Sequence, residues 1–311
     1  MKGNQAMKKG FFLSIMVIVC GLFVMPLSLH ATPVYFEAGH GGYAGSGFDV
    51  DTETDPWDEA SFRADTGTTQ FDDVGPAGLS VGDTFTDFGH AKWINYNFLT
   101  GFPGDGEGLD QAGGYDVTIK WDNLQGFVSQ IDDPGTVSQN INTEYIGGTF
   151  NLYFDPVHDA DFGATTNPND DIGFGNAGEI HFMTISNVEG TGTNTFTPDS
   201  TTGTFTQGAS NLTGQVTMLN MGYLYEFSND LDLNSYVAIN WLFGELDQNT
   251  QAAGIITTNL GLDDELFTVY SRHDGSMRLN VVPEPATMLL LGSGLLGLAG
   301  FGRKKKFFKK G

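Results

Sequence analysis

A run of alternating acidic residues near the start of the chain offers the most pointed chemistry in the sequence. The run comprises Asp49, Asp51, Glu53 and Asp55. Carboxylates at this spacing can wrap Ca²⁺ in a loop. The run departs from the EF-hand loop, because Thr54 stands where that loop needs Gly and Ala60 where it needs a bidentate Glu. On a strand, the same spacing would instead place all four side chains on one solvated face. Structural Ca²⁺ is therefore one possible interpretation of this run and of the acidic segments at 159–171 and 229–234. No other cofactor is expected.

Nucleophilic and zinc chemistry find little support in the residue patterns. The only cysteine, Cys20, lies close to the N-terminus, so the body of the chain has no thiol. The five histidines of the body show no His-Glu-x-x-His spacing. They are His40, His90, His158, His181 and His273. We therefore expect surface or strand histidines rather than catalysts.

Sugar chemistry is the remaining enzymatic alternative. Paired carboxylates hydrolyse glycosides, but the body holds 37 Asp and Glu residues, so their adjacency in the sequence indicates little. Trp57 and Trp93 are candidates for stacking on a sugar, with burial in the core as the other reading. We expect a protein that is not an enzyme, with a secreted carbohydrate-binding or carbohydrate-active module as the alternative.

The charge of the body excludes one class of partner. Between residues 32 and 282 the chain has 37 acidic and only five basic residues, a net charge of −32. The basic residues are Arg63, Lys92, Lys120, Arg272 and Arg278. Nucleic-acid binding requires clustered Lys and Arg, so we expect no nucleic-acid partner.

The elements that would position any site are strands, because the apolar residues recur with period two. From Tyr115 to Trp121, for example, apolar and polar side chains alternate. The expected strands are 34–38, 84–88, 92–98, 115–121, 149–154, 179–188, 215–227, 236–241 and 266–271. Clusters of Gly, Asn, Asp and Pro separate them, as in turns.

These strands predict an all-β body, folded as an antiparallel β-sandwich of which a jelly roll is one form. One short helix is expected near Pro56–Arg63, since Asp55 can cap it and Pro56 suits the first helical position. Residues 190–206 are rich in Thr and Gly and are expected to form a mobile loop. One or two β domains both fit the length.

The N-terminal segment has the pattern of a signal peptide. Lys2, Lys8 and Lys9 precede an apolar run from Phe11 to Met25, and Ala31 is a small residue at the expected cleavage point. An uncleaved membrane anchor is one alternative, and lipidation at Cys20 is another. Export is expected in each case.

The C-terminal segment combines three features in order. Pro283, Glu284 and Pro285 precede an apolar stretch at 286–302, which is near the lower limit for a membrane span. A basic cluster follows it: Arg303, Lys304, Lys305, Lys306, Lys309 and Lys310. The positive-inside rule keeps this cluster cytoplasmic, which places the body outside the inner membrane.

This order of Pro-Glu-Pro motif, apolar helix and basic tail resembles the PEP-CTERM sorting signal of exported Gram-negative proteins. The resemblance covers only about 30 residues, at 282–311. It implies that an exosortase, a membrane-embedded processing enzyme, acts on Pro283, Glu284 and Pro285. A plain single-pass anchor is the alternative.

The sequence thus predicts three parts: a signal peptide at 1–31, an acidic β body at 32–281 and a sorting segment at 282–311. The expected precursor is anchored in the inner membrane, and the product lies at the cell surface or outside the cell. By analogy with the family, its partner is exopolysaccharide, in biofilm. The body itself matches no family that we recognise.

Overall fold

A computed structural model provides the structure of the protein. It describes residues 31–45, 52–71, 73, 79–101, 108–134, 138–174, 178–198, 203–238, 240, 242–250, 255–258 and 265–281. All of them belong to one compact unit, Ala31–Gly311. The signal peptide up to residue 30, two of the four Ca²⁺ candidates (Asp49 and Asp51) and the sorting segment from 282 onward lie outside the described residues.

The prediction of an all-β body is confirmed. The strands are β1 (Val34–Phe36), β2 (Trp57–Phe71), β3 (Thr84–Phe98), β4 (Asp116–Asp132), β5 (Gln139–Gly147), β6 (Thr149–Asp155), β7 (Ile180–Pro198), β8 (Gly203–Leu219), β9 (Leu224–Glu226), β10 (Leu231–Asp232), β11 (Leu242–Thr250), β12 (Ile255–Thr258) and β13 (Glu265–Val281). The described helices are all short: η1 (Ala38–Gly41), η2 (Pro168–Asp170) and α2 (Asn234–Val237).

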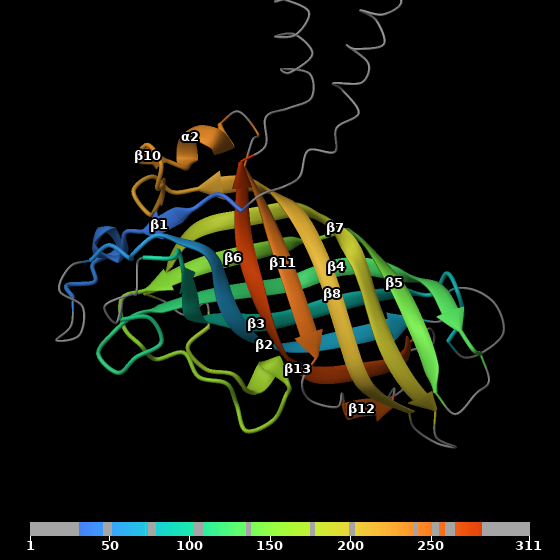
Figure 1. Ribbon diagram of the computed structural model, residues 1–311. Coiled ribbons are helices and arrows are strands. Elements are labelled where there is room, and N and C mark those ends of the chain that lie inside the picture. The colour runs from blue at the N-terminus through green and yellow to red at the C-terminus, as the bar shows by residue number, and fades with distance from the viewer. Residues whose placement is uncertain are drawn as a thin grey trace, which may run out of the picture. The chain divides into compact units, whose positions relative to one another are not determined.

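Eight strands close into an antiparallel barrel (Figure 1), so the predicted sandwich is wrong. Their order is β2-β3-β4-β5-β7-β8-β11-β13, and β13 pairs back onto β2, with Tyr270 opposite Gly67 and Met277 opposite Ala60. Closure gives every one of these strands a neighbour on both sides, which removes the free edges that an open sheet exposes. The short strands β1, β9 and β10 continue from β2 at one end.

Strands β5 and β6 together act as one bent strand of the barrel. Both pair with β4 and with β7, β5 along one half of these strands and β6 along the other. Gly148 separates them and has a φ of 130°, a backbone conformation that favours glycine. The bend lets a single position in the barrel wall follow two long neighbours.

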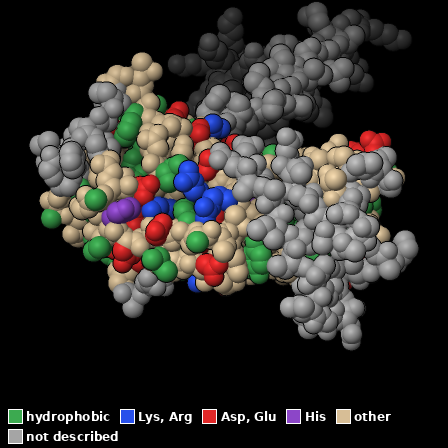
Figure 2. Space-filling view, turned by 90° about the horizontal axis from the view of Figure 1, so that it is seen from below, with side chains coloured by type: hydrophobic (Ala, Val, Ile, Leu, Met, Phe, Trp, Pro, Cys, Tyr) green, Lys and Arg blue, Asp and Glu red, His purple; other side chains and the backbone are tan. Residues whose placement is uncertain are grey.

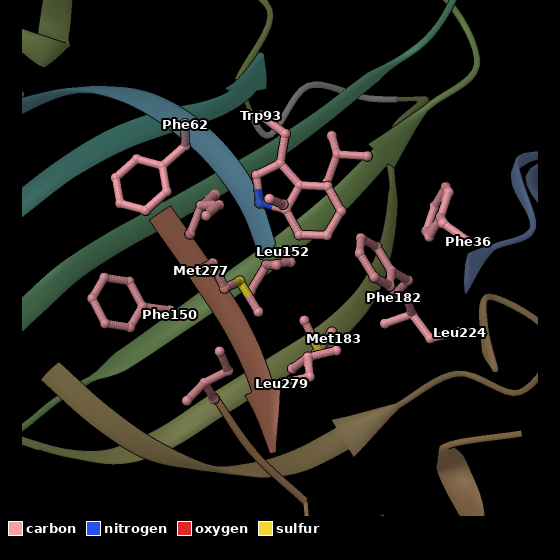
Figure 3. Close-up of a cluster of buried hydrophobic side chains, with 14 of the residues drawn as sticks. Phe36, Phe62, Trp93, Phe150, Leu152, Phe182, Met183, Leu224, Met277 and Leu279 are labelled. Atoms are coloured by element: carbon pink, nitrogen blue, oxygen red, sulfur yellow. The ribbon is translucent and has the colours of Figure 1, made fainter. Parts of the chain in front are cut away.

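The interior of the barrel is apolar in one half. Residues on β2, β3, β4, β6, β7, β8, β11 and β13 point inward there and are buried (Figure 3). They include Phe62, Trp93, Phe150, Leu152, Met183, Met277 and Leu279. This core accounts for the stability of a body without cysteine, since burial of large apolar side chains is the main favourable term in folding.

The other half of the interior is polar. A cavity of about 50 Å³ lies there. Its lining includes Thr66, Thr68, Asp87, Tyr145, Ser210, Gln248, Ser271 and His273. The Tyr145 hydroxyl donates a 2.8 Å hydrogen bond to Asp87 Oδ2, and His273 Nε2 lies 2.7 Å from Thr66 Oγ1. None of the described residues that line this cavity is Lys or Arg.

Three local predictions are corrected. The helix expected at Pro56–Arg63 is the start of β2, because the alternation of inward Ala60 and Phe62 with outward Ser61 and Arg63 fits the barrel wall. The strand expected at 236–241 is instead partly the helix α2.

The loop expected at 190–206 is instead largely strand. Residues 190–198 of β7 pair with β8 out to Pro198 opposite Gly203, and only 199–202 between them lie outside the described residues. Thr and Gly fit here because the backbone hydrogen bonds of the two strands hold the hairpin.

Candidate functional site

The basic residues of the body gather on one side of the barrel. All five project from four adjacent strands, β13, β2, β3 and β4. Figure 2 shows Lys and Arg side chains grouped on one face, with acidic side chains between them. Four of the five form ion pairs there: Arg63 with Asp274, Lys92 with Asp110, Arg272 with Asp65 and Arg278 with Glu59. In a body of net charge −32, this face therefore carries all five of its Lys and Arg residues.

Residues 156–174, which we call the strap, lie across the outer surface of β13, β2 and β3. Lys92 Nζ donates a 2.6 Å hydrogen bond to the carbonyl of Ala160. Arg272 Nη2 lies 3.3 Å from the carbonyl oxygen of Gly163 and 3.2 Å from that of Thr165. Farther along, Asp171 Oδ2 lies 3.4 Å from His90 Nδ1. Cations of the barrel wall therefore hold the strap through its backbone carbonyls.

Arg272 connects the strap to the barrel wall. Its guanidinium binds the buried Asp65 in bidentate fashion, with Nε 2.6 Å from Oδ1 and Nη2 2.5 Å from Oδ2. Burial raises the pKa of Asp65, and the hydrogen bond from Arg272 opposes that rise. The same hydrogen bond raises the pKa of Arg272. Arg272 also lies over the Phe162 ring, 5.4 Å from its centroid, so one cation joins the wall and the strap.

One cluster on this face brings together groups that are distant in sequence. Lys92 Nζ lies 2.7 Å from Asp110 Oδ1 and 4.0 Å from Asp116 Oδ1. His158 Nδ1 lies 2.8 Å from Asp116 Oδ1 and 3.8 Å from Asp110 Oδ1. Asp116 is completely buried, whereas Asp110 and His158 keep 28% and 27% of their side-chain surface exposed.

The backbone holds the two carboxylates of this cluster in place. Asp116 Oδ2 accepts hydrogen bonds from the amides of Asp159 and Ala160, at 3.0 and 2.9 Å. Asp110 has a φ of 53° in a turn where its amide donates to the Tyr115 carbonyl and the Tyr115 amide donates to the Gly108 carbonyl, both at 3.0 Å. Asp is one of the few side chains that adopt this left-handed conformation readily.

A pocket of about 530 Å³ opens beside the cluster, between the strap and the outer surface of β2 and β3. Its lining is Arg63, Lys92, Ile94, Asp110, His158, Asp159, Ala160, Asp161, Phe162 and Ile172. Residues of both charge signs and four apolar residues, Ile94, Ala160, Phe162 and Ile172, line the same space. Such a lining can hydrogen-bond a ligand rich in hydroxyl groups, because carboxylates accept and cations donate.

Only some of the predicted site residues lie among the residues that the structure describes. Of the Ca²⁺ candidates, Glu53 forms an isolated bridge with Glu37 and Asp55 is exposed only in part. With Asp49 and Asp51 outside the described residues, that prediction stays untested. The sorting motif Pro283, Glu284 and Pro285 and the basic cluster from Arg303 to Lys310 also lie outside the described residues.

Trp57 and Trp93 are both completely buried, at 0% exposure. They contact each other edge to face, with ring centroids 5.5 Å apart. The hypothesis that they stack on a sugar is therefore wrong, and the alternative reading of core residues is confirmed.

Sequence reasoning did not find the cluster of Lys92, Asp110, Asp116 and His158, because no local pattern links residues this far apart. It also passed over a Gly-x-Ser-x-Gly pattern at 78–82. Ser80 of that pattern lies in the turn before β3, where its amide donates to Asp83 Oδ2 at 2.6 Å. A nucleophile elbow needs a helix after the serine, whereas here a strand follows.

Comparison with known proteins identifies the C-terminal segment. Residues 281–305 match the model of the PEP-CTERM protein-sorting motif, so the resemblance predicted from the sequence is confirmed. The motif supports an exported protein that an exosortase processes, with a membrane-anchored precursor and a product at the cell surface. No curated protein matches the chain, and its body belongs to no family that we recognise. Within the described residues, no helix is long and apolar enough to cross a membrane.

Proposed function

We propose that this protein is a noncatalytic component of the cell surface or extracellular matrix, associated with exopolysaccharide in biofilm. The sorting motif at 281–305 is the observation that supports this location, because it directs the chain to an exosortase. The strongly acidic body suits a solvated matrix protein, since a net charge far from zero opposes aggregation.

The contacts of the most reactive groups favour a noncatalytic role. Lys92 Nζ is engaged by Asp110 and the Ala160 carbonyl, and Asp116 has both carboxylate oxygens occupied by His158 and by backbone amides. A general base or nucleophile must reach its substrate. These groups instead bind one another and hold the strap against the barrel.

The strap pocket is the proposed contact with the polymer. Arg63 and Asp161 line it together with Phe162, so a sugar chain would find donors, acceptors and one aromatic face. A neutral, hydroxyl-rich chain suits the pocket better than a polyanion, because the surrounding body would repel negative charge.

Retention on the exopolysaccharide of the native host tests this proposal. Processed protein is mixed with the washed polymer, and the bound fraction is measured by sedimentation. Arg63→Ala and Asp161→Ala should each lower the bound fraction, whereas Asp122→Ala should not, because Asp122 is an exposed residue of β4 outside the pocket lining. Equal retention of all four proteins would contradict the role of the pocket.

A carbohydrate-active enzyme is the second candidate, favoured by three aspartates, Asp110, Asp159 and Asp161, that line the same pocket. Glycoside hydrolysis would release reducing ends from the same polymer. We expect none above the background of heat-denatured protein. Release that is abolished by Asp110→Asn would favour the enzyme over the binding protein.

A further inference from the structure

We infer that Asp110, Asp116 and His158 form a binding site for a divalent transition-metal ion such as Zn²⁺, at one side of the strap pocket. This inference is independent of the proposed exopolysaccharide association, and nothing in the sorting motif bears on it. Each of the three residues comes from a different part of the chain: the turn before β4, the first residue of β4 and the strap.

The spacing of the three donor atoms suits one ion. His158 Nδ1 lies 2.8 Å from Asp116 Oδ1 and 3.8 Å from Asp110 Oδ1, and all three atoms lie within 4.8 Å of one another. Zn²⁺ binds nitrogen and oxygen at about 2.0–2.2 Å, so neighbouring ligands around it stand roughly 3–4 Å apart. Small side-chain adjustments would bring all three onto a common ion.

The chemistry of the donors selects the class of metal. One imidazole nitrogen and two carboxylate oxygens suit Zn²⁺ and similar first-row ions, whereas Ca²⁺ takes oxygen ligands alone. Asp110 and His158 also line the pocket, so any remaining coordination position can hold water or a ligand there. The predicted Ca²⁺ run at 49–55 is a separate segment and plays no part.

The supports of these ligands are already in place. Asp116 Oδ2 is held by the amides of Asp159 and Ala160, which leaves Oδ1 directed to His158. Hydrogen bonds of this kind orient the ligands of metal sites and are costly to remove. The side chain of Asp116 is therefore already fixed in position before an ion binds.

The protein already places a cation against this cluster, namely the ammonium of the buried Lys92. A metal ion would take over the contact with Asp110, while Lys92 keeps its hydrogen bond to the Ala160 carbonyl. His158 would bind through the lone pair of Nδ1, so a proton on that atom moves to Nε2 or is released to solvent. Lys92 thus competes with the metal and should weaken its binding.

Titration of the purified, chelator-treated full protein with Zn²⁺ tests the inference, with Co²⁺ as a spectroscopic probe. We expect one ion per chain, and Co²⁺ absorption that reports a nitrogen ligand. His158→Ala should weaken Zn²⁺ binding by about 100-fold or more, because removing a ligand costs at least as much as removing its support. Lys92→Met should tighten binding by about tenfold, through loss of a nearby like charge.

His90→Ala is the matched control, because His90 also pairs with a strap carboxylate, that of Asp171, but lies outside the cluster. Circular dichroism of each variant verifies folding. Absence of Zn²⁺ binding, unchanged binding in His158→Ala, or an equal loss in His90→Ala would overturn the inference. Retention on the exopolysaccharide is also measured in the presence of chelator. Retention that persists without metal would leave the proposed function standing even if the metal site fails.

Discussion

Asp87 and His273 both line the polar cavity inside the barrel, where burial shifts their pKa values in opposite directions. Burial raises the pKa of Asp87 from 3.8 to about 6, although hydrogen bonds from Thr68 and Tyr145 oppose the rise. Burial lowers the pKa of His273 from 6.5 to about 4. Both side chains are therefore favoured in their neutral forms, because burial penalises the charged form of each.

These shifts predict opposite effects on stability across the same pH range. The stabilising contribution of neutral Asp87 is complete below about pH 4 and is lost as the pH rises through 6. That of neutral His273 is complete above pH 6.5 and is lost as the pH falls through about 4. In the native protein the two trends offset each other.

Asp87→Asn and His273→Gln should separate the two trends. Relative to the native protein, Asp87→Asn should gain stability by about 3 kcal/mol between pH 4 and 7, and His273→Gln should lose a similar amount. Urea denaturation at several pH values measures both differences. Parallel pH profiles for all three proteins would show that neither group titrates as described.

We expect the strap to depend on Arg272 more than on the other cations of its face, because Arg272 contacts two strap carbonyls and the Phe162 ring. Lysine at this position would keep the charge but could not bind Asp65 with two parallel hydrogen bonds or reach both strap carbonyls. We predict that Arg272→Lys lowers the free energy of unfolding by about 1–3 kcal/mol, because buried Asp65 loses part of its pairing.

Arg278→Lys provides the control, since Arg278 pairs with Glu59 at a more exposed position and should cost less than about 1 kcal/mol. Hydrogen exchange at the amides of Asp161 and Ile172, which bond to each other's carbonyls, reports on the strap directly. Equal losses in the two variants, or unchanged exchange in Arg272→Lys, would contradict the assigned role.

The bent strand formed by β5 and β6 requires glycine at position 148. A methyl group there would stand 2.5 Å from Leu124 Cδ2 and 2.7 Å from Leu124 Cα, in addition to the unfavourable φ of 130°. Gly148→Ala should therefore destabilise the protein by roughly 2–3 kcal/mol. At Gly147 a methyl group would meet no atom within 4 Å, so Gly147→Ala should cost under about 1 kcal/mol. Thermal unfolding of the two variants measures this difference. Equal melting temperatures would contradict the requirement for glycine at position 148.

At the scale of single strands, the sequence predicts the structure well where apolar and polar side chains alternate strictly. The expected strands at 84–88, 92–98, 115–121 and 149–154 all lie in β3, β4 and β6, because each places apolar side chains on one face. It fails at the start of 236–241, where Tyr236 and Val237 belong to the short helix α2, while residues 239 and 241 lie outside the described residues. It also fails at 190–206, since turn-forming residues can belong to a hairpin held by backbone bonds.

For the whole molecule, the period-two pattern could not distinguish a sandwich from a barrel. Inner faces alternate with outer faces in both, and only the pairing of β13 with β2, strands that stand at opposite ends of the body, closes the sheet. The cluster at Asp110, Asp116 and His158 also escapes prediction, because it depends on the pairing of β6 with β4, which places Asp155 opposite Asp116. The sorting motif could be predicted because its parts are consecutive in the sequence.

Export and processing of the chain can be tested by the intact mass of the protein recovered from the cell surface and medium of its native host. Native protein and Glu284→Ala are compared. We predict that the native mass lacks residues 1–31 and everything beyond the Pro-Glu-Pro region, and that Glu284→Ala is not processed at this end. A native mass that still includes residues 303–311 would contradict processing by an exosortase and indicate a protein that stays tethered to the membrane.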